Sequence, residues 1–136
     1  MNTKIIPYLM FSGDAKAAME FYQKVLGAEI IMEVTYGDMP DSPSQDEKDL
    51  IAHAHLKIDS SDIMISDSPS KFPVKQGDQV SICLSSHDVE RSKQFFDGLK
   101  EGALIKMPFQ ETSFSKGYGS LVDRFGVTFL IDTAQE

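Results

Sequence analysis

Residues 110–131, QETSFSKGYGSLVDRFGVTFLI, carry two apolar-rich runs on either side of the tetrapeptide Asp123-Arg124-Phe125-Gly126. An aspartate at the start of a turn accepts hydrogen bonds from nearby backbone N–H groups, and glycine adopts a positive φ without a Cβ clash. The segment therefore predicts a β-hairpin, with strands over residues 116–122 and 127–133.

The first part of the chain predicts a strand, a helix and a second strand. Residues 5–11 are apolar but contain Pro7, which indicates the start of a strand or a sheet edge because proline cannot donate a ladder hydrogen bond. Asp14 is the expected N-cap of a helix, and Gly27 is its expected stop. One face of that helix is apolar at helical spacing, and residues 29–36 follow as a strand. The apolar face consists of Ala18, Phe21, Tyr22, Val25 and Leu26.

A second pair of strands follows a loop. Residues 37–49 hold two prolines and five acidic residues, which predicts a mobile acidic loop. Residues 51–58 alternate, so that apolar side chains point one way and His53 and His55 point the other. After a turn at residues 59–61, the chain returns as a strand over residues 62–66.

The pattern then begins again. At a shift of 74 residues, Asp14 aligns with Asp88, and the aromatic pair at 21–22 aligns with the pair at 95–96. These matches lie at cap and core positions, which two copies of one supersecondary unit share. The sequence therefore predicts an α+β fold of two βαβββ modules. We expect one domain over residues 1–136, with module one at about 1–67, a linker at about 68–78 and module two at about 79–136.

Composition excludes several classes of protein. The net charge is −8 and the estimated pI is about 4.8, which argues against binding nucleic acid or an anionic membrane surface. No apolar run reaches the roughly 18 residues of a membrane span. Residues 1–4 lead directly into a strand-like run, unlike a signal peptide. A single cysteine, Cys83, fits a reducing compartment, so we expect a cytoplasmic protein.

Four segments resemble one protein family. They are Pro7-Tyr8-Leu9 with Phe11, residues 21–28 (FYQKVLGA), His53-Ala54 with the apolar positions after it, and residues 110–119. They resemble the PhnB-like branch, also labelled demethylubiquinone-methyltransferase-like, of the vicinal-oxygen-chelate superfamily, which includes glyoxalase I and the bleomycin and fosfomycin resistance proteins. The resemblance implies that the modules form a curved, cup-like mixed sheet with helices on its outer face. It also implies a homodimer.

The resemblance implies a metal site that this sequence lacks. Family ligands come from the first and last strands of each module, and the matching residues are Pro7, Ser66, Ser81 and Leu130. None offers the imidazole or carboxylate that such metals bind. The chain also has no glycine-rich strand–turn–helix for a nucleotide-like cofactor, so we expect no cofactor.

Other side chains are candidates for lining the cup. His53 and His55 are candidates as metal ligands, a general base or anion contacts, although a half-exposed strand or a subunit contact also explains them. Cys83 is also explained as a small buried apolar residue.

Leu9 and Phe11 share a face with Pro7 and would make the floor apolar. Four methionines, Met10, Met19, Met32 and Met64, are expected to pack in the core. The remaining candidates, on the last hairpin and the first strand of module two, are Ser81, Lys116, Tyr118, Ser120 and Thr128.

The sequence supports three functions. The first is metal-free binding of a small apolar or aromatic molecule in the cup. The alternative is an enzyme of the same fold, which uses His53 and His55 as an unusual metal site or uses His55 and Tyr118 in acid–base chemistry. The third is a protein without a small-molecule ligand that acts through its acidic loop.

Overall fold

The computed structural model describes residues 2–40 and 44–135, and the chain forms two compact units, Met1–Lys75 and Gln76–Glu136. Each unit contains a four-stranded mixed sheet and one longer helix. The prediction of an α+β fold with two βαβββ modules is therefore confirmed.

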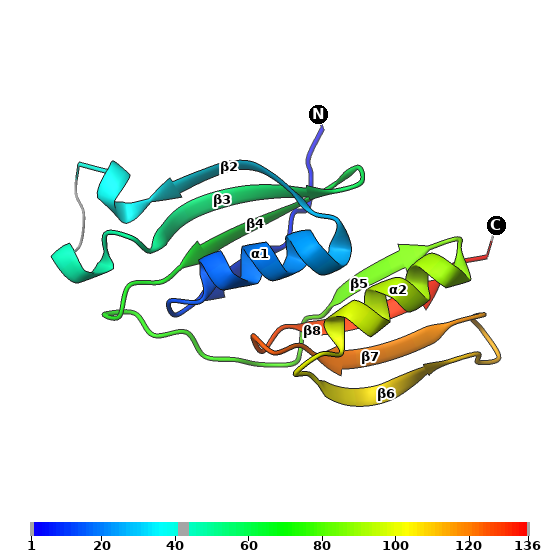
Figure 1. Ribbon diagram of the computed structural model, residues 1–136. Coiled ribbons are helices and arrows are strands. Elements are labelled where there is room, and N and C mark those ends of the chain that lie inside the picture. Colours follow the sequence, from blue (N-terminus) through cyan, green and yellow to red (C-terminus); the bar gives the residue numbers. More distant parts are fainter. Residues whose placement is uncertain (1, 41–43, 136) are drawn as a thin grey trace. The chain divides into compact units, whose positions relative to one another are not determined.

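The first unit has a sheet with the strand order β1-β4-β3-β2, in which β1 and β4 are parallel and the other pairs are antiparallel. Helix α1 lies across one face of this sheet (Figure 1). Two short 3₁₀ turns, Tyr36–Asp38 and Gln45–Glu47, occupy the acidic loop, of which residues 41–43 lie outside the described residues. The elements are β1 (Tyr8–Phe11), α1 (Ala15–Leu26), β2 (Glu29–Thr35), β3 (Ile51–Ile58) and β4 (Ser61–Asp67).

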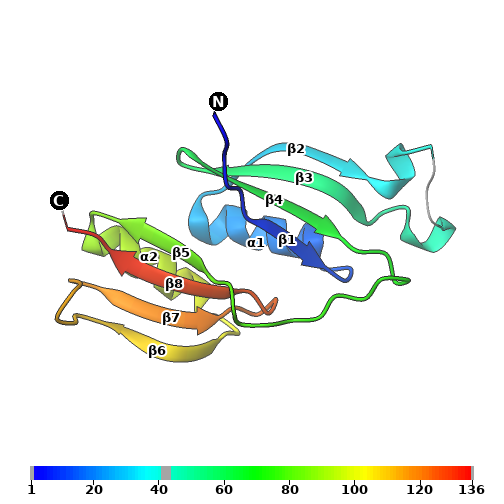
Figure 2. The same ribbon diagram turned by 180° about the vertical axis from the view of Figure 1, so that it is seen from behind.

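The second unit repeats this arrangement with the strand order β5-β8-β7-β6, in which β5 and β8 are parallel. Helix α2 lies across one face of the sheet, and Figure 2 shows the strands from the opposite side. The same strand pairings in both units confirm the internal repeat. The elements are β5 (Ile82–Ser86), α2 (Val89–Leu99), β6 (Leu104–Gln110), β7 (Tyr118–Val122) and β8 (Thr128–Thr133).

The last hairpin turns as the sequence predicts. Asp123 Oδ1 accepts hydrogen bonds from Phe125 N at 2.9 Å and Val127 N at 3.0 Å. Gly126 has φ 88°, a conformation that favours glycine. The first strand is shorter than predicted because β7 begins at Tyr118, so that Lys116 lies before it.

The helix ends agree with the sequence at two of the three expected points, Gly27 and Asp88. Gly27 ends α1 with φ 68°, and Asp88 caps α2, with Oδ1 accepting from Glu90 N at 3.0 Å. The expected cap at Asp14 is wrong in its side chain, which makes no capping bond. Instead Asp67, at the end of β4, accepts from Gly13 N at 2.8 Å and from Ala15 N at 3.0 Å through Oδ1.

Each helix buries an apolar stripe against its sheet, and this contact forms the core of each unit. Neither helix in the described ranges is long and apolar enough to cross a membrane. Core residues of the first unit include Ala18, Met19, Phe21, Tyr22, Ala54, Leu56 and Ile65, and those of the second include Phe95, Phe96, Leu99, Leu121, Phe129 and Ile131.

Candidate functional site

The side of the first sheet that faces away from α1, here called the first open face, carries the two predicted histidines. Strand register pairs His55 with Met64 and with Met32, and pairs Tyr8 with Met64. Directly paired residues lie on the same face of a sheet, so these four side chains share the first open face. His53, two residues before His55, lies there as well.

The face of the first strand differs from the expectation. Phe11 is buried and pairs with Asp67, so Leu9 and Phe11 face α1 rather than forming the floor of a cup. Pro7 lies just before β1, where its carbonyl accepts a hydrogen bond from Met64 N at 2.9 Å. A shift of one residue reverses the face, and it puts Tyr8 and Met10 on the first open face instead.

Both histidines on this face have oriented rings. Tyr8 Oη and His53 Nδ1 are 3.2 Å apart, and the two ring centroids are 5.8 Å apart. His55 Nε2 and Asp62 Oδ1 are 2.9 Å apart, so the imidazole donates to the carboxylate. Two ring nitrogens are therefore already in hydrogen bonds within the unit.

Asp62 is the point where the charged groups of this face meet. Besides His55, Lys57 Nζ lies 3.5 Å from its Oδ1 and Lys4 Nζ lies 3.7 Å from its Oδ2. The hydrogen bond from His55 lowers the pKa of the Asp62 carboxyl, desolvation opposes this, and the two lysines lower it further. Asp62 therefore stays a carboxylate that can hold the His55 ring in one orientation.

The first open face exposes large apolar side chains. Tyr8 is 46% exposed, Met10 49% and Met32 43%. The expectation that Met10 and Met32 pack in the core is wrong, whereas Met19, on the buried side of α1, is fully buried. The reason is that β1 and β2 each present one face to solvent and one to the helix. The result is an apolar surface with two imidazoles in it.

The equivalent face of the second sheet holds most of the other candidates. Leu130 pairs with both Cys83 and Ser120, Tyr118 pairs with Asp132, and Val122 pairs with Thr128. Cys83, Tyr118, Ser120 and Thr128 therefore share one face. Cys83 is exposed, so its expected role as a small buried apolar residue is wrong. Partial desolvation of the thiol, together with the nearby Asp132 carboxylate, raises the pKa of Cys83 and disfavours the reactive thiolate. The last of these candidates, Ser81, lies just before β5.

The residues at the family's metal positions do not fit a metal. Pro7 and Leu130 have no donor atom in their side chains, and Ser66 and Ser81 offer only neutral hydroxyls. In residues 2–40 and 44–135, no group of three or more His, Cys, Asp or Glu side chains is placed to hold an ion. His53 and His55 form no such group with Asp62.

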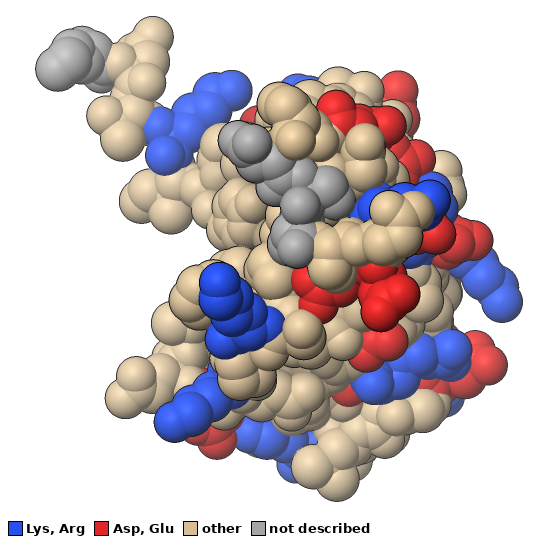
Figure 3. Space-filling model, turned by 90° about the vertical axis from the view of Figure 1, so that its left-hand side faces the viewer, with Lys and Arg blue, Asp and Glu red and all other residues tan. Residues whose placement is uncertain are grey.

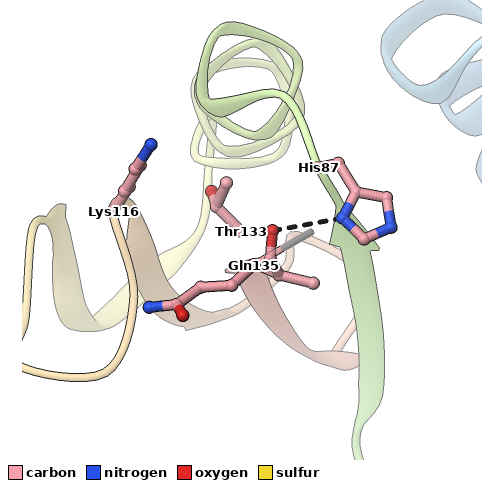
Figure 4. Close-up of a pocket in the computed structure, with 5 residues that line it drawn as sticks. His87, Lys116, Thr133 and Gln135 are labelled. Carbon is pink, nitrogen blue, oxygen red and sulfur yellow. Dashed lines mark hydrogen bonds between the residues drawn. The ribbon is translucent and has the colours of Figure 1, made fainter.

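A pocket of about 500 Å³ lies at one end of the second unit. It is bounded by the end of β8, by His87 two residues before α2, and by Lys116 ahead of β7 (Figure 4). Lys116 was a sequence candidate, but His87 and Gln135 were missed because they lie outside regular strands. The pocket is lined by His87, Lys116, Thr133, Ala134 and Gln135.

The charged side chains form no continuous basic stripe on the face drawn in Figure 3. Described Lys and Arg residues there lie in small groups separated by Asp, Glu and uncharged residues. A surface that follows a phosphate backbone requires clustered cations. This face of the described chain lacks that feature.

Comparison with known proteins gives consistent matches. A family model described as 3-demethylubiquinone-9 3-methyltransferase matches residues 3–132. Protein YjdN of Escherichia coli (strain K12) is 36% identical over 141 residues, covering 96% of this chain and 95% of YjdN. The crystal structure of protein PA1353 from Pseudomonas aeruginosa has a TM-score of 0.91 and 31% identity, covering 99% of this chain and all of PA1353.

Two further solved structures have a similar fold. The PhnB protein from Bacillus cereus has a TM-score of 0.77 and 27% identity, over 96% of this chain and 98% of its own. A glyoxylase/bleomycin resistance protein/dioxygenase domain from Frankia sp. EAN1pec has a TM-score of 0.72 and 13% identity, over 99% of each chain. At that identity the second match shows the fold alone.

Proposed function

Because this chain belongs to the 3-demethylubiquinone-9 3-methyltransferase family, and has the PhnB-like fold of the glyoxalase/bleomycin resistance superfamily, we propose that it binds a small molecule. The ligand is apolar or aromatic, and it lies on the first open face without a metal ion. The observation that carries this proposal is the exposure of Tyr8, Met10 and Met32 beside two oriented histidines.

The chemistry of the face suits such a ligand. Burying apolar area contributes roughly 25 cal/mol per Å², and methionine side chains adapt to irregular shapes. A few fixed polar groups then set the ligand's orientation. Tyr8 and His53 offer such groups through the atoms that their mutual hydrogen bond leaves free.

The proposal excludes both a family metal and methyl transfer. The family metal positions Pro7, Ser66, Ser81 and Leu130 lack suitable donors. The turns that lead into the helices, Ser12-Gly13-Asp14 and Ser86-His87-Asp88, hold one glycine and none. A nucleotide-like cofactor is usually held by a glycine-rich turn at this point.

A second candidate function is an enzyme of the same fold. The observation that favours it is the 2.9 Å contact between His55 Nε2 and Asp62 Oδ1, since a carboxylate that orients an imidazole is a common feature of general bases. In that case His55 removes a proton from a molecule on the first open face. Exchange of a C–H proton of the bound molecule for deuterium, abolished in His55→Gln, would favour this candidate over simple binding.

The test of binding uses methionine methyl groups as reporters. The protein is labelled with ¹³C at the methionine methyl and titrated with 1-naphthol as an aromatic probe. We expect saturable shifts for Met10, Met32 and Met64, and none for the buried Met19. Shifts confined to other methyl groups, or no saturable shift, would contradict the proposal.

A pair of matched variants makes the test specific. Met32 and Met39 belong to the same unit and are 43% and 45% exposed, but Met39 lies beyond β2, after the turn at Tyr36–Asp38. Met32→Glu is expected to weaken 1-naphthol binding by about tenfold, because it puts a carboxylate in the apolar contact. Met39→Glu makes the same chemical change elsewhere and is expected to leave binding unchanged. Equal losses in both variants would point to a general effect of charge.

Assembly and location are further proposals. We propose one domain over residues 1–136, a homodimer as the resemblance implies, and a cytoplasmic location consistent with the single cysteine. The other lining candidates, Ser81, Cys83, Lys116, Tyr118, Ser120 and Thr128, are proposed as ligand contacts of the second unit.

A further inference from the structure

The pocket of the second unit lies where three strand ends meet the start of a helix. Strands β5 and β8 are parallel and end side by side at Ser86 and Thr133. Strand β7 begins opposite the end of β8, since Tyr118 pairs with Asp132. The chain continues from these ends into His87, Gln135 and Lys116, which surround about 500 Å³ (Figure 4).

Some of the lining groups are already in hydrogen bonds. His87 Nδ1 lies 3.2 Å from the carbonyl oxygen of Ala134, and a carbonyl only accepts, so Nδ1 carries the proton. The Thr133 hydroxyl lies 2.9 Å from both the Gly117 carbonyl oxygen and Ser92 Oγ. Three polar groups remain for a ligand: the Lys116 ammonium, His87 Nε2 and the Gln135 carboxamide. Figure 4 shows Lys116 and His87 on opposite sides, with Gln135 between them.

The five side chains that line the pocket carry a net positive charge, in contrast with the whole chain at −8. The five lining residues include one lysine and no Asp or Glu. No ion pair joins Lys116 to another residue in the described ranges. Three acids adjoin lining residues in the sequence: Asp88, Asp132 and Glu136. Asp88 is engaged as the helix cap, with Oδ1 accepting from Glu90 N, and the Asp132 carboxylate lies near Cys83.

The internal repeat shows how the first unit fills the corresponding place. Phe11 pairs with Asp67 in the first unit as Ser86 pairs with Thr133 in the second, so Asp67 and Thr133 are equivalent. The Asp67 carboxylate, 1% exposed, binds the backbone at the start of α1. The second unit has a hydroxyl there, and an open pocket with a cation on its rim. In the first unit the chain's own Asp67 carboxylate occupies this position. In the second unit the pocket has room for the carboxylate of a ligand.

We propose that this pocket binds the carboxylate or phosphate group of a small molecule, with Lys116 as its counter-ion. His87 Nε2 and the Gln135 carboxamide hydrogen-bond to the rest of the ligand. Lysine binds such oxyanions as a point charge. The site is separate from the first open face, so it stands or falls independently of the binding proposed there.

The experiment is a ¹H–¹⁵N NMR titration of the full chain with two probes, sodium phosphate and sodium acetate, at fixed pH and ionic strength. Saturable shifts of the amides of His87, Lys116 and Gln135 with either probe are expected. The two arms distinguish the phosphate from the carboxylate source. Saturation by neither probe, or equal shifts across the whole second unit, would overturn the proposal.

Two lysine variants control for charge. Lys116→Gln is expected to weaken probe binding by about fivefold or more, since it removes the counter-ion. Lys106→Gln removes an exposed lysine of β6 in the same unit, whose Nζ lies 3.6 Å from Asp78 Oδ2. This variant is expected to bind the probes as tightly as the native chain does. Equal binding by Lys116→Gln and the native chain would refute the role of Lys116. The spectra themselves report whether each variant is folded.

Discussion

Replacing Asp67 by asparagine is expected to destabilise the first unit more than any surface change. The side chain is 1% exposed and accepts three backbone hydrogen bonds, from Gly13 N, Ala15 N and Ile51 N. It thereby joins the start of α1 and the start of β3 to the end of β4.

The magnitude follows from the geometry of the two oxygens. Oδ1 serves Gly13 and Ala15, and Oδ2 serves Ile51 at 3.0 Å. An asparagine that keeps its oxygen in the Oδ1 position turns its NH₂ toward the Ile51 N–H. One bond to a charged group is lost, worth about 1.5–3 kcal/mol, and a buried N–H is left without an acceptor, which costs about 1–3 kcal/mol more. We expect a loss of about 3 kcal/mol in the free energy of unfolding.

The assay is urea unfolding followed by circular dichroism, with amide hydrogen exchange of Ile51 measured in parallel. Asp97→Asn is the control, because Asp97 pairs with Lys93 at 2.8 Å on the exposed face of α2 and such pairs contribute at most about 1 kcal/mol. A loss below about 1 kcal/mol in Asp67→Asn, with the Ile51 amide still protected from exchange, would show that the three hydrogen bonds to Asp67 do not stabilise the unit as expected.

Three further predictions concern other parts of the chain. Burial, and then the Asp67 carboxylate, raise the pKa of the Tyr36 hydroxyl, which donates to the Asp67 carbonyl at 2.8 Å. The Tyr36 hydroxyl therefore keeps its proton to higher pH in the folded state than in the unfolded state. Its contribution to the free energy of unfolding is fully present below the ordinary tyrosine pKa near 10 and is lost as the pH rises above it. In urea titrations, Tyr36→Phe should lower the free energy of unfolding by about 1 kcal/mol at pH 8. Above pH 10 the free energy of unfolding should fall less steeply with pH in the variant than in the native chain, and equal slopes would contradict this. Asp132→Asn should lower the pKa of Cys83 and speed its reaction with a disulfide reagent roughly twofold at pH 8, and an unchanged rate would exclude that coupling. Light scattering at micromolar concentration should give twice the 15.1 kDa chain mass, and a monomer mass would exclude the homodimer.

Local interactions account for what the sequence predicts well. The Asp123 turn, the stop at Gly27 and the cap at Asp88 each depend on groups within five residues of one another. Their geometry is set by the backbone and by one side chain, so a short segment contains all the information. The internal repeat presents the same pattern of strands and helix twice, which is why the order of elements was predictable.

Long-range pairing explains what the sequence does not predict. Asp67 replaces Asp14 as the acceptor at the start of α1, although it lies 54 residues from Gly13. The face of β1 depends on its parallel register with β4, and an assignment shifted by one residue exchanges Leu9 and Phe11 for Tyr8 and Met10. Neither fact is available without the strand order.

The candidate site was predictable in part for the same reasons. Alternation in residues 51–58 placed His53 and His55 on one face correctly. Asp62 could have been found as the partner of His55, because the tight turn before it pairs Lys57 with Asp62 across the hairpin. His87 and Gln135 could not, since they come together only because β5 and β8 are parallel neighbours.

The most direct test of the proposed function is a crystal structure of the chain with 1-naphthol bound. We expect the ring against Met10 and Met32, with its hydroxyl within hydrogen-bond distance of Tyr8 or His53. A probe found only away from the first open face, or an open face that other protein atoms cover completely, would contradict it.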